Sequence, residues 1–174
     1  NCGTIEIRSG EIEAHAGGDI GDTSTHRRPG GAGIGGAALG SGGKITITGG
    51  KVYADGEWGG GAGIGGGCQG DGGQITIEGG NIRGVGGTGA CTCSDTAVTT
   101  HTKEAGGGAG IGGGFLASGG KITIKGGYIN PQGGEGICTC TSLPTASGGG
   151  LQYPKGADIG SGECHVCDQN RPSP

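Results

Sequence analysis

The stretch that decides the fold is GKITITGGKVYA, residues 43–54. Three further stretches repeat its spacing of apolar residues, namely GTIEIRSGEIEA at 3–14, GQITIEGGNIRG at 73–84 and GKITIKGGYINP at 120–131. A second motif follows each copy downstream, reading AGIGGA at 32–37, AGIGGG at 62–67, AGIGGG at 109–114 and ADIGSG at 157–162. The chain is therefore four copies of one unit, the pattern of repeat proteins in which each unit contacts its neighbours.

Each unit contains three short segments of strand type, because apolar and polar residues alternate with a period of two. When the four units are stacked, like residues fall in line. The predicted inward columns are Ile5, Ile45, Ile75 and Ile122; Ile7, Ile47, Ile77 and Ile124; Ile12, Val52, Ile82 and Ile129; and Ile34, Ile64, Ile111 and Ile159. On the outside, Glu11 is expected beside Lys51 and Glu78 beside Lys125, as neighbours that support the register.

The predicted fold class is all-β, a right-handed parallel β-solenoid (β-helix) of four coils with three short strands per coil, stapled by disulfides. The handedness follows from the general rule for parallel crossover connections. We expect one solenoid domain over residues 1–163 and a cysteine-containing C-terminal tail or linker over residues 164–174. No secretory signal pattern precedes the first coil, so we expect a mature or excised segment.

The composition excludes several other classes. There are 52 glycines and only six prolines among 174 residues, and the glycines come in runs, which does not fit the strict triplet of collagen. A helical bundle is excluded because each glycine costs about 1 kcal/mol in a helix relative to alanine. The net charge is −4, without a stripe of Lys and Arg, so we expect no nucleic-acid partner. No apolar stretch is long enough for a membrane span.

The eight cysteines indicate disulfides and an extracellular, oxidising setting. The offset from Cys91 to Cys138 and from Cys93 to Cys140 equals that from Ile75 to Ile122, so the two Cys-Thr-Cys segments should stack. Adjacent coils lie about 4.8 Å apart, within the Cα window of a disulfide, so Cys91–Cys138 and Cys93–Cys140 are the predicted pairs. Metal binding by these four thiolates is the rival interpretation. The pairing of the others stays open. Cys164 and Cys167 form a CxxC that we interpret as structural. For Cys2 there are two alternatives, a pair within the chain, for example with Cys68, and a link between molecules.

Candidate ligand-binding residues lie in the loops after the second strand of each unit, since insertions of repeat proteins gather on one edge, which is often the binding face. Five residues of this edge are singled out: Trp58, Tyr53, His26, Asp22 and His101. Trp58 is a candidate platform for a sugar ring, and the rival reading is an aromatic that covers a glycine-rich corner. We predict no catalytic residues, metal site or cofactor, because no column offers aligned carboxylates and no phosphate-loop pattern occurs.

The alternation of GGxITIxGG with GGAGIGGG, at residues 42–50, 60–67, 72–80 and 107–114, resembles the glycine-rich GAGIGGG repeats of large secreted or surface-anchored bacterial and protist proteins. That resemblance implies a right-handed parallel β-helix and a carbohydrate-binding or adhesin-like role, but it transfers no site residues.

Open strand edges at both ends favour another function, a non-enzymatic extracellular structural module that stacks end to end, or in tandem, into a fibre or a surface or matrix assembly. Its expected partners are further copies of itself, head to tail, or other surface and matrix proteins, with glycans as a further partner. The alternatives are a carbohydrate-binding or adhesin module that uses the loop edge and, less favoured, a carbohydrate-active enzyme.

Overall fold

The computed structural model describes residues 3–17, 29–93, 104–140, 151–153, 155–162 and 165–166. The described residues form strands, turns and bends, and none of them is helical. Within these ranges, accordingly, no helix could cross a membrane. The all-β class is confirmed for this part of the chain.

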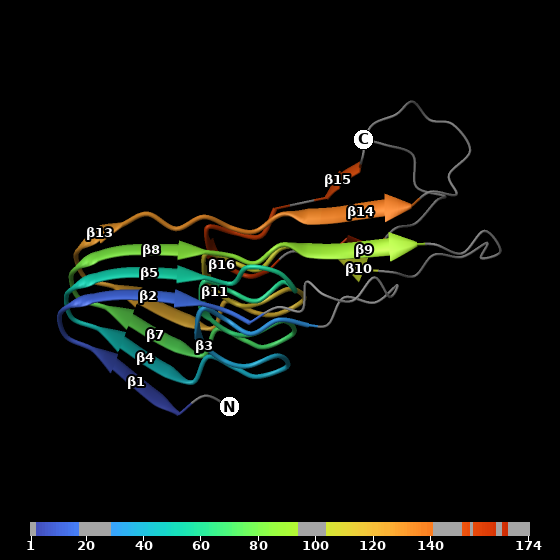
Figure 1. The fold of residues 1–174 in the computed structure, drawn as a ribbon. Helices are drawn as coiled ribbons and strands as arrows, with labels where there is room; N and C mark the ends of the chain where they lie inside the picture. Colours follow the sequence, from blue (N-terminus) through green and yellow to red (C-terminus); the bar gives the residue numbers. More distant parts are fainter. Residues whose placement is uncertain are drawn as a thin grey trace.

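Three parallel sheets of four strands form the body of the molecule (Figure 1). The first contains β1 (Thr4–Ile7), β4 (Lys44–Ile47), β7 (Gln74–Ile77) and β12 (Lys121–Ile124) in that order. The second contains β2 (Glu11–His15), β5 (Lys51–Asp55), β8 (Asn81–Val85) and β13 (Tyr128–Ile129). The third contains β3 (Ile34–Gly35), β6 (Ile64–Gly65), β11 (Ile111–Gly112) and β16 (Ile159–Gly160). We call the three strands that each repeat contributes a coil, so that coils one to four follow the chain.

The register between coils is the one that the repeats predict. Ile5 pairs with Ile45, Ile45 with Ile75, and Ile75 with Ile122 along the first sheet. The two expected ion pairs form between coils, with Lys51 Nζ 2.6 Å from Glu11 Oε1 and Lys125 Nζ 2.8 Å from Glu78 Oε1. The arrangement is therefore a β-helix-like stack of repeats.

Additional strands extend beyond this stack. β9 (Gly89–Cys93) pairs in parallel with β14 (Gly136–Cys140), and β15 (Leu151–Tyr153) pairs antiparallel with β14. In Figure 1, β9 and β14 lie side by side and project away from the three sheets. β10 (Glu104–Ala105) pairs antiparallel with β17 (His165–Val166), so part of the predicted tail is joined to the loop of coil three.

The core consists of the predicted isoleucine columns. The side chains that are fully removed from solvent all belong to coils two and three: Ile45, Ile47, Val52, Ile64, Ile75, Ile77, Ile82 and Ile111. In the first two sheets these residues alternate along the strand with outward residues, as in the pattern of Lys44–Ile47, whereas Ile64 and Ile111 of the third sheet lie between glycines. This interior is narrow. Each Å² of apolar surface buried in it contributes about 25 cal/mol to the free energy of folding.

Glycine is required where coils approach each other most closely. Gly65 has a φ of +135°, a conformation that L-residues with side chains rarely adopt. A Cβ atom built on Gly65 would lie 2.0 Å from the carbonyl oxygen of Gly112 in the next coil. The glycines of the third sheet therefore permit direct backbone-to-backbone packing between coils.

Candidate functional site

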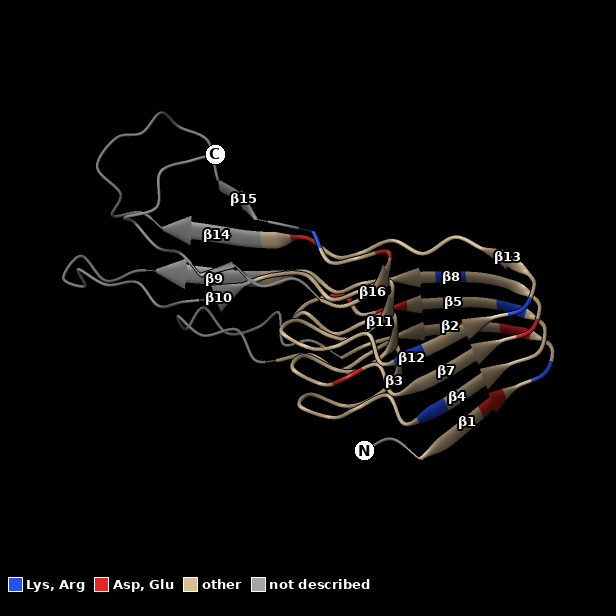
Figure 2. Ribbon diagram, turned by 180° about the vertical axis from the view of Figure 1, so that it is seen from behind, with Lys and Arg blue, Asp and Glu red and all other residues tan. Residues whose placement is uncertain are grey.

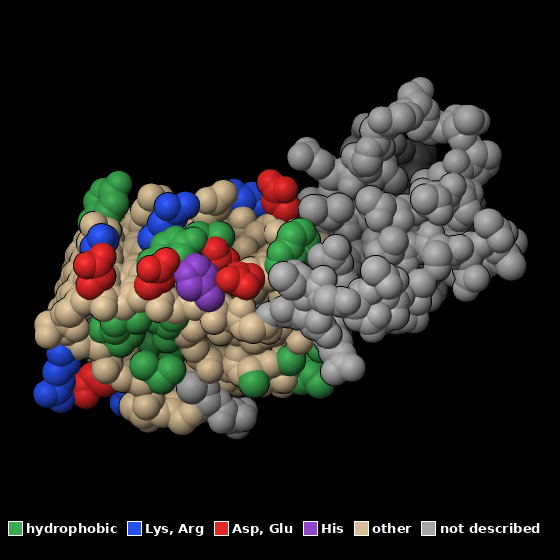
Figure 3. Space-filling view, viewed as in Figure 1, with side chains coloured by type: hydrophobic (Ala, Val, Ile, Leu, Met, Phe, Trp, Pro, Cys, Tyr) green, Lys and Arg blue, Asp and Glu red, His purple; other side chains and the backbone are tan. Residues whose placement is uncertain are grey.

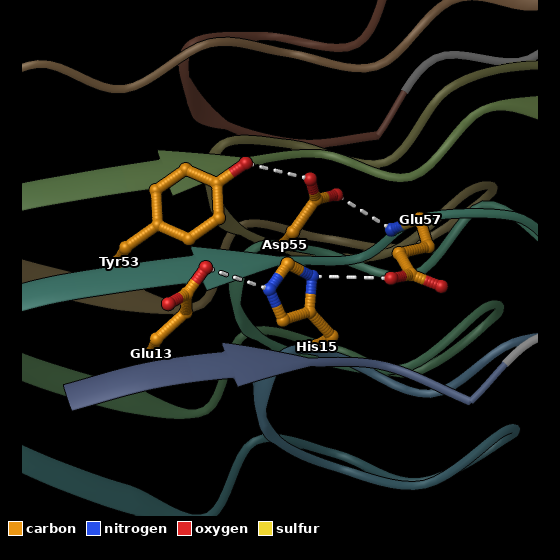
Figure 4. A network of polar contacts seen from close by, with 5 residues as sticks. All are labelled: Glu13, His15, Tyr53, Asp55 and Glu57. Carbon is orange, nitrogen blue, oxygen red and sulfur yellow. Dashed lines mark hydrogen bonds and ion pairs between the residues drawn. The ribbon is translucent and has the colours of Figure 1, made fainter.

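A polar network lies on the outer face of the second sheet, where β2 and β5 end (Figure 4). Its members are Glu13 and His15 of β2, Tyr53 and Asp55 of β5, and Glu57 of the loop that follows. The strands place these side chains outward because Ile12, Val52 and Ala54 alternate with them and face the core. Figure 3 shows the histidine on this face surrounded by acidic side chains. The network thus gathers three carboxylates around one imidazole.

His15 contacts two carboxylates through its two ring nitrogens. Nε2 lies 3.2 Å from Glu13 Oε1, and Nδ1 lies 3.1 Å from Glu57 Oε1. The hydrogen bond with Glu13, together with the charge of Glu57, raises the pKa of His15 above its ordinary value of 6.5. When protonated, the ring donates from both nitrogens, and it then joins coil one to the loop of coil two.

Tyr53 and Asp55 hold that loop from the other side. The Tyr53 hydroxyl donates a hydrogen bond of 2.9 Å to Asp55 Oδ2, which raises the pKa of the tyrosine. Asp55 Oδ1 accepts a 2.8 Å hydrogen bond from the backbone N–H of Glu57. Glu57 has a φ of +45°, so this bond stabilises a left-handed backbone position that non-glycine residues seldom occupy.

The Tyr53 ring contacts residues of both neighbouring coils. Arg83 of β8 places its Cζ 5.4 Å from the ring centroid, in a cation–π contact. The His15 ring lies tilted at 5.6 Å between centroids. Tyr53, singled out as a candidate ligand-binding residue, therefore contacts Arg83 and His15 on adjacent strands.

This network links coil one to the loop of coil two, through the contact of His15 with Glu57. The Tyr53 hydroxyl is engaged in the hydrogen bond to Asp55, and both ring nitrogens of His15 contact carboxylates. Among the residues whose side chains are described, no group of three or more His, Cys, Asp or Glu is arranged to hold a metal ion.

The predicted ligand-binding residues are placed only in part. Trp58 is 37% exposed, and its backbone forms a parallel bridge to Thr88 of the next coil. Tyr53 lies within the polar network. Asp22, His26 and His101 fall outside the described residues. Of the residues in contact here, the sequence singled out Tyr53 but not Glu13 or Arg83, although both alternate outward with residues of the core, and that signal was available.

The cysteines divide into three groups. Cys91 pairs with Cys138 and Cys93 with Cys140 in the backbone register, as predicted, whereas the disulfides themselves remain predictions because the description there covers the backbone. Cys68 is buried and forms no disulfide within the described residues, and burial raises the pKa of its thiol to about 11. Its pairing with Cys2 stays a prediction. Cys2, Cys164 and Cys167 lie outside the described residues.

The end of the stack formed by coil four exposes apolar side chains of the inward columns. Ile124 is 41% exposed and Ile159 is 43% exposed, although their equivalents Ile77 and Ile111 are completely buried. Ile122 and Ile129 of the same coil are half-buried. β12, β13 and β16 are the edge strands of their sheets at this end, and β1, β2 and β3 are the edge strands at the other. The columns were predicted as inward throughout, and in coil four this is only partly met, because nothing described stacks on that coil.

No protein-family model, curated protein or solved structure matches this chain.

Proposed function

We propose that this chain is a non-enzymatic structural module of an extracellular fibre or matrix, which assembles by stacking its open ends. The observation that carries the proposal is the partial exposure of Ile124 and Ile159 at the edge of coil four. Both belong to columns that are otherwise a closed core. A further coil on this end would bury them as Ile77 and Ile111 are buried.

The strand edges support the same proposal. At each end, three neighbouring edge strands present backbone groups on the side without a described partner strand. Such edges are templates for pairing with another chain, and natural proteins commonly block them with prolines, bulges or charges directed inward. Here the inward positions at both edges carry isoleucine, for example Ile5 and Ile122.

The finer features of the fold belong to this proposal. We take the coils as right-handed, because parallel crossovers almost always are. We also take Cys91–Cys138 and Cys93–Cys140 as disulfides, which the matched register of β9 and β14 supports. Disulfides of this kind persist in oxidising compartments, and this supports an extracellular location.

A charge at the exposed column tests the function. Ile124→Lys should weaken self-association by about tenfold or more, since removing one partly buried isoleucine and desolvating a lysine costs more than 1.4 kcal/mol. The measurement is sedimentation velocity over a concentration series, with negative-stain electron microscopy of the same samples.

Asn81→Lys is the matched control, because it adds the same charge at an exposed position of inner strand β8. It should assemble like the parent chain. A parent chain that stays monomeric at high concentration and forms no fibres would contradict the proposal, as would equal effects of the two substitutions.

A carbohydrate-binding function at the loop edge remains a prediction that no described contact favours. Trp58 is partly exposed, but the Tyr53 ring is flanked by Arg83 and His15. We therefore place self-assembly first.

A further inference from the structure

The two ends of the stack are complementary rather than alike. All strands within the three main sheets pair in parallel, so the edge at coil four and the edge at coil one face opposite directions along one axis. A second copy that is translated along this axis would continue each sheet in parallel. A copy that is turned to bring like ends together would have to pair antiparallel, which breaks the column geometry.

The isoleucine columns continue across such a junction. Translation would bring Ile5 beside Ile122, Ile7 beside Ile124 and Ile12 beside Ile129. In the third sheet it would bring Ile34 beside Ile159. Within one chain the equivalent neighbours are Ile45 with Ile75 and Ile64 with Ile111, and these are completely buried. The junction would thus repeat the contact that already joins coils two and three.

The backbone at both ends has the shape of an inner coil with its neighbour missing. Gly160 has a φ of +135°, like Gly65, but a Cβ atom built on it would meet only the Ala157 Cβ, at 3.5 Å. At the opposite end Gly10 has a φ of +95°, and a Cβ atom there would meet nothing within 4 Å. The equivalent Cβ atom on Gly50 would lie 2.8 Å from the Gly10 carbonyl oxygen. Both end glycines therefore leave room for a further backbone.

The charges of the first sheet distinguish unlike ends from like ends. In Figure 2 the charged residues of this sheet lie mainly near the beginnings and ends of its strands. Translation would place Glu6 opposite Thr123, with Lys121 and Lys125 two residues to either side. Arg8 would oppose Lys125, but each has a carboxylate partner of its own, Glu6 at 2.9 Å and Glu78 at 2.8 Å. Two coil-four ends would instead bring lysine against lysine.

From these observations we infer that the partner at each end is a second copy of this chain, joined head to tail in a parallel ladder with β12 of one copy against β1 of the next. The register is Lys121 opposite Thr4, Ile122 opposite Ile5 and Thr123 opposite Glu6. This inference rests on the proposed function and adds the polarity and the register of the junction. The resulting fibre is polar, because every copy points the same way.

Disulfide trapping tests the register. Glu6→Cys and Thr123→Cys are made in separate chains, which are mixed and oxidised. Cα atoms of directly opposed residues lie about 4.8 Å apart, which permits a disulfide. Within one chain these two positions are three ladder steps apart, about 14 Å, so the cross-link joins two copies. Peptide mass mapping of the disulfide separates it from links through native cysteines.

The matched control replaces Thr123→Cys with Lys125→Cys, two residues further along the chain and just past the end of β12. That shift adds about 6.6 Å along the strand and puts the Cα separation at about 8 Å, beyond disulfide reach. We expect at least about tenfold more cross-link for the Glu6→Cys and Thr123→Cys mixture than for the control. Equal or greater cross-linking in the control, or a dimer of Glu6→Cys alone, would overturn the inference.

Light scattering of the same samples distinguishes a wrong register from a failure of the chains to stack. Assembly without the expected cross-link would overturn the register and leave the stacking function standing. Absence of assembly in the parent chain would overturn both.

Discussion

Coils two and four contain almost the same strand, KITIT and KITIK, in different surroundings. Ile45 and Ile47 of coil two are completely buried, whereas Ile124 of coil four is 41% exposed. The difference arises because coil two has a neighbour on both sides and coil four has a described neighbour on one side only. Burial in this protein is thus a property of the place in the stack. Substitutions of equivalent residues in inner and end coils therefore measure how much the position in the stack contributes to stability.

The largest difference in the free energy of unfolding is expected between Gly65→Ala and Gly160→Ala. Both introduce strain at a φ of +135°, which costs about 1–3 kcal/mol. Only the Gly65 substitution also drives a Cβ atom against the Gly112 carbonyl. We expect Gly65→Ala to lower the free energy of unfolding by more than about 4 kcal/mol, as measured by urea denaturation of the monomer. Equal losses for the two variants would mean that backbone packing between coils is not the constraint.

A smaller difference is expected between Ile75→Ala and Ile124→Ala. Ile75 is completely buried, so its truncation should cost about 2–5 kcal/mol through lost burial and a cavity. Ile124 is partly exposed, and its truncation should cost less than about 1.5 kcal/mol in the monomer. Denaturation under conditions without assembly gives both values. If assembly is then restored, the cost at Ile124 should rise, and a constant cost would argue against burial of Ile124 at the junction.

The smallest effect is expected for the polar contact between coils one and two. The pKa of His15 is raised by Glu13 and Glu57, so its stabilising contribution is fully present below the unfolded pKa, near 6.5, and is lost as the pH rises through the folded pKa. His15→Gln should therefore lower Tm more at pH 5.5 than at pH 8.5, relative to the parent chain. Glu57→Gln should reduce the same pH dependence. A His15→Gln difference that is independent of pH would show that the ionic contact contributes nothing.

Sequence periodicity predicted the ladders well because register in a stack is set by matching columns. Ile75 opposite Ile122 and Cys91 opposite Cys138 follow from one constant offset. The contact of His15 with Glu57 could not be predicted, because it depends on the path of a loop and on the left-handed backbone of Glu57. The contact of Arg83 with the Tyr53 ring could not be predicted for the same reason, since it depends on how the side chains of two neighbouring coils are placed.

The sequence by itself determined the repeat, the choice of inward residues and the need for glycine at the corners, because these are local properties that recur in every unit. Only the tertiary structure decided which copies of the same motif are buried, that Cys68 is buried, and that His15 of β2 contacts Glu57 of the loop after β5. The physical reason is that solvent exposure and long-range polar contacts depend on what lies above and below each coil. The sequence pattern of a repeated unit is the same at the middle and at the end of the stack, so it does not show which unit has a neighbour on both sides.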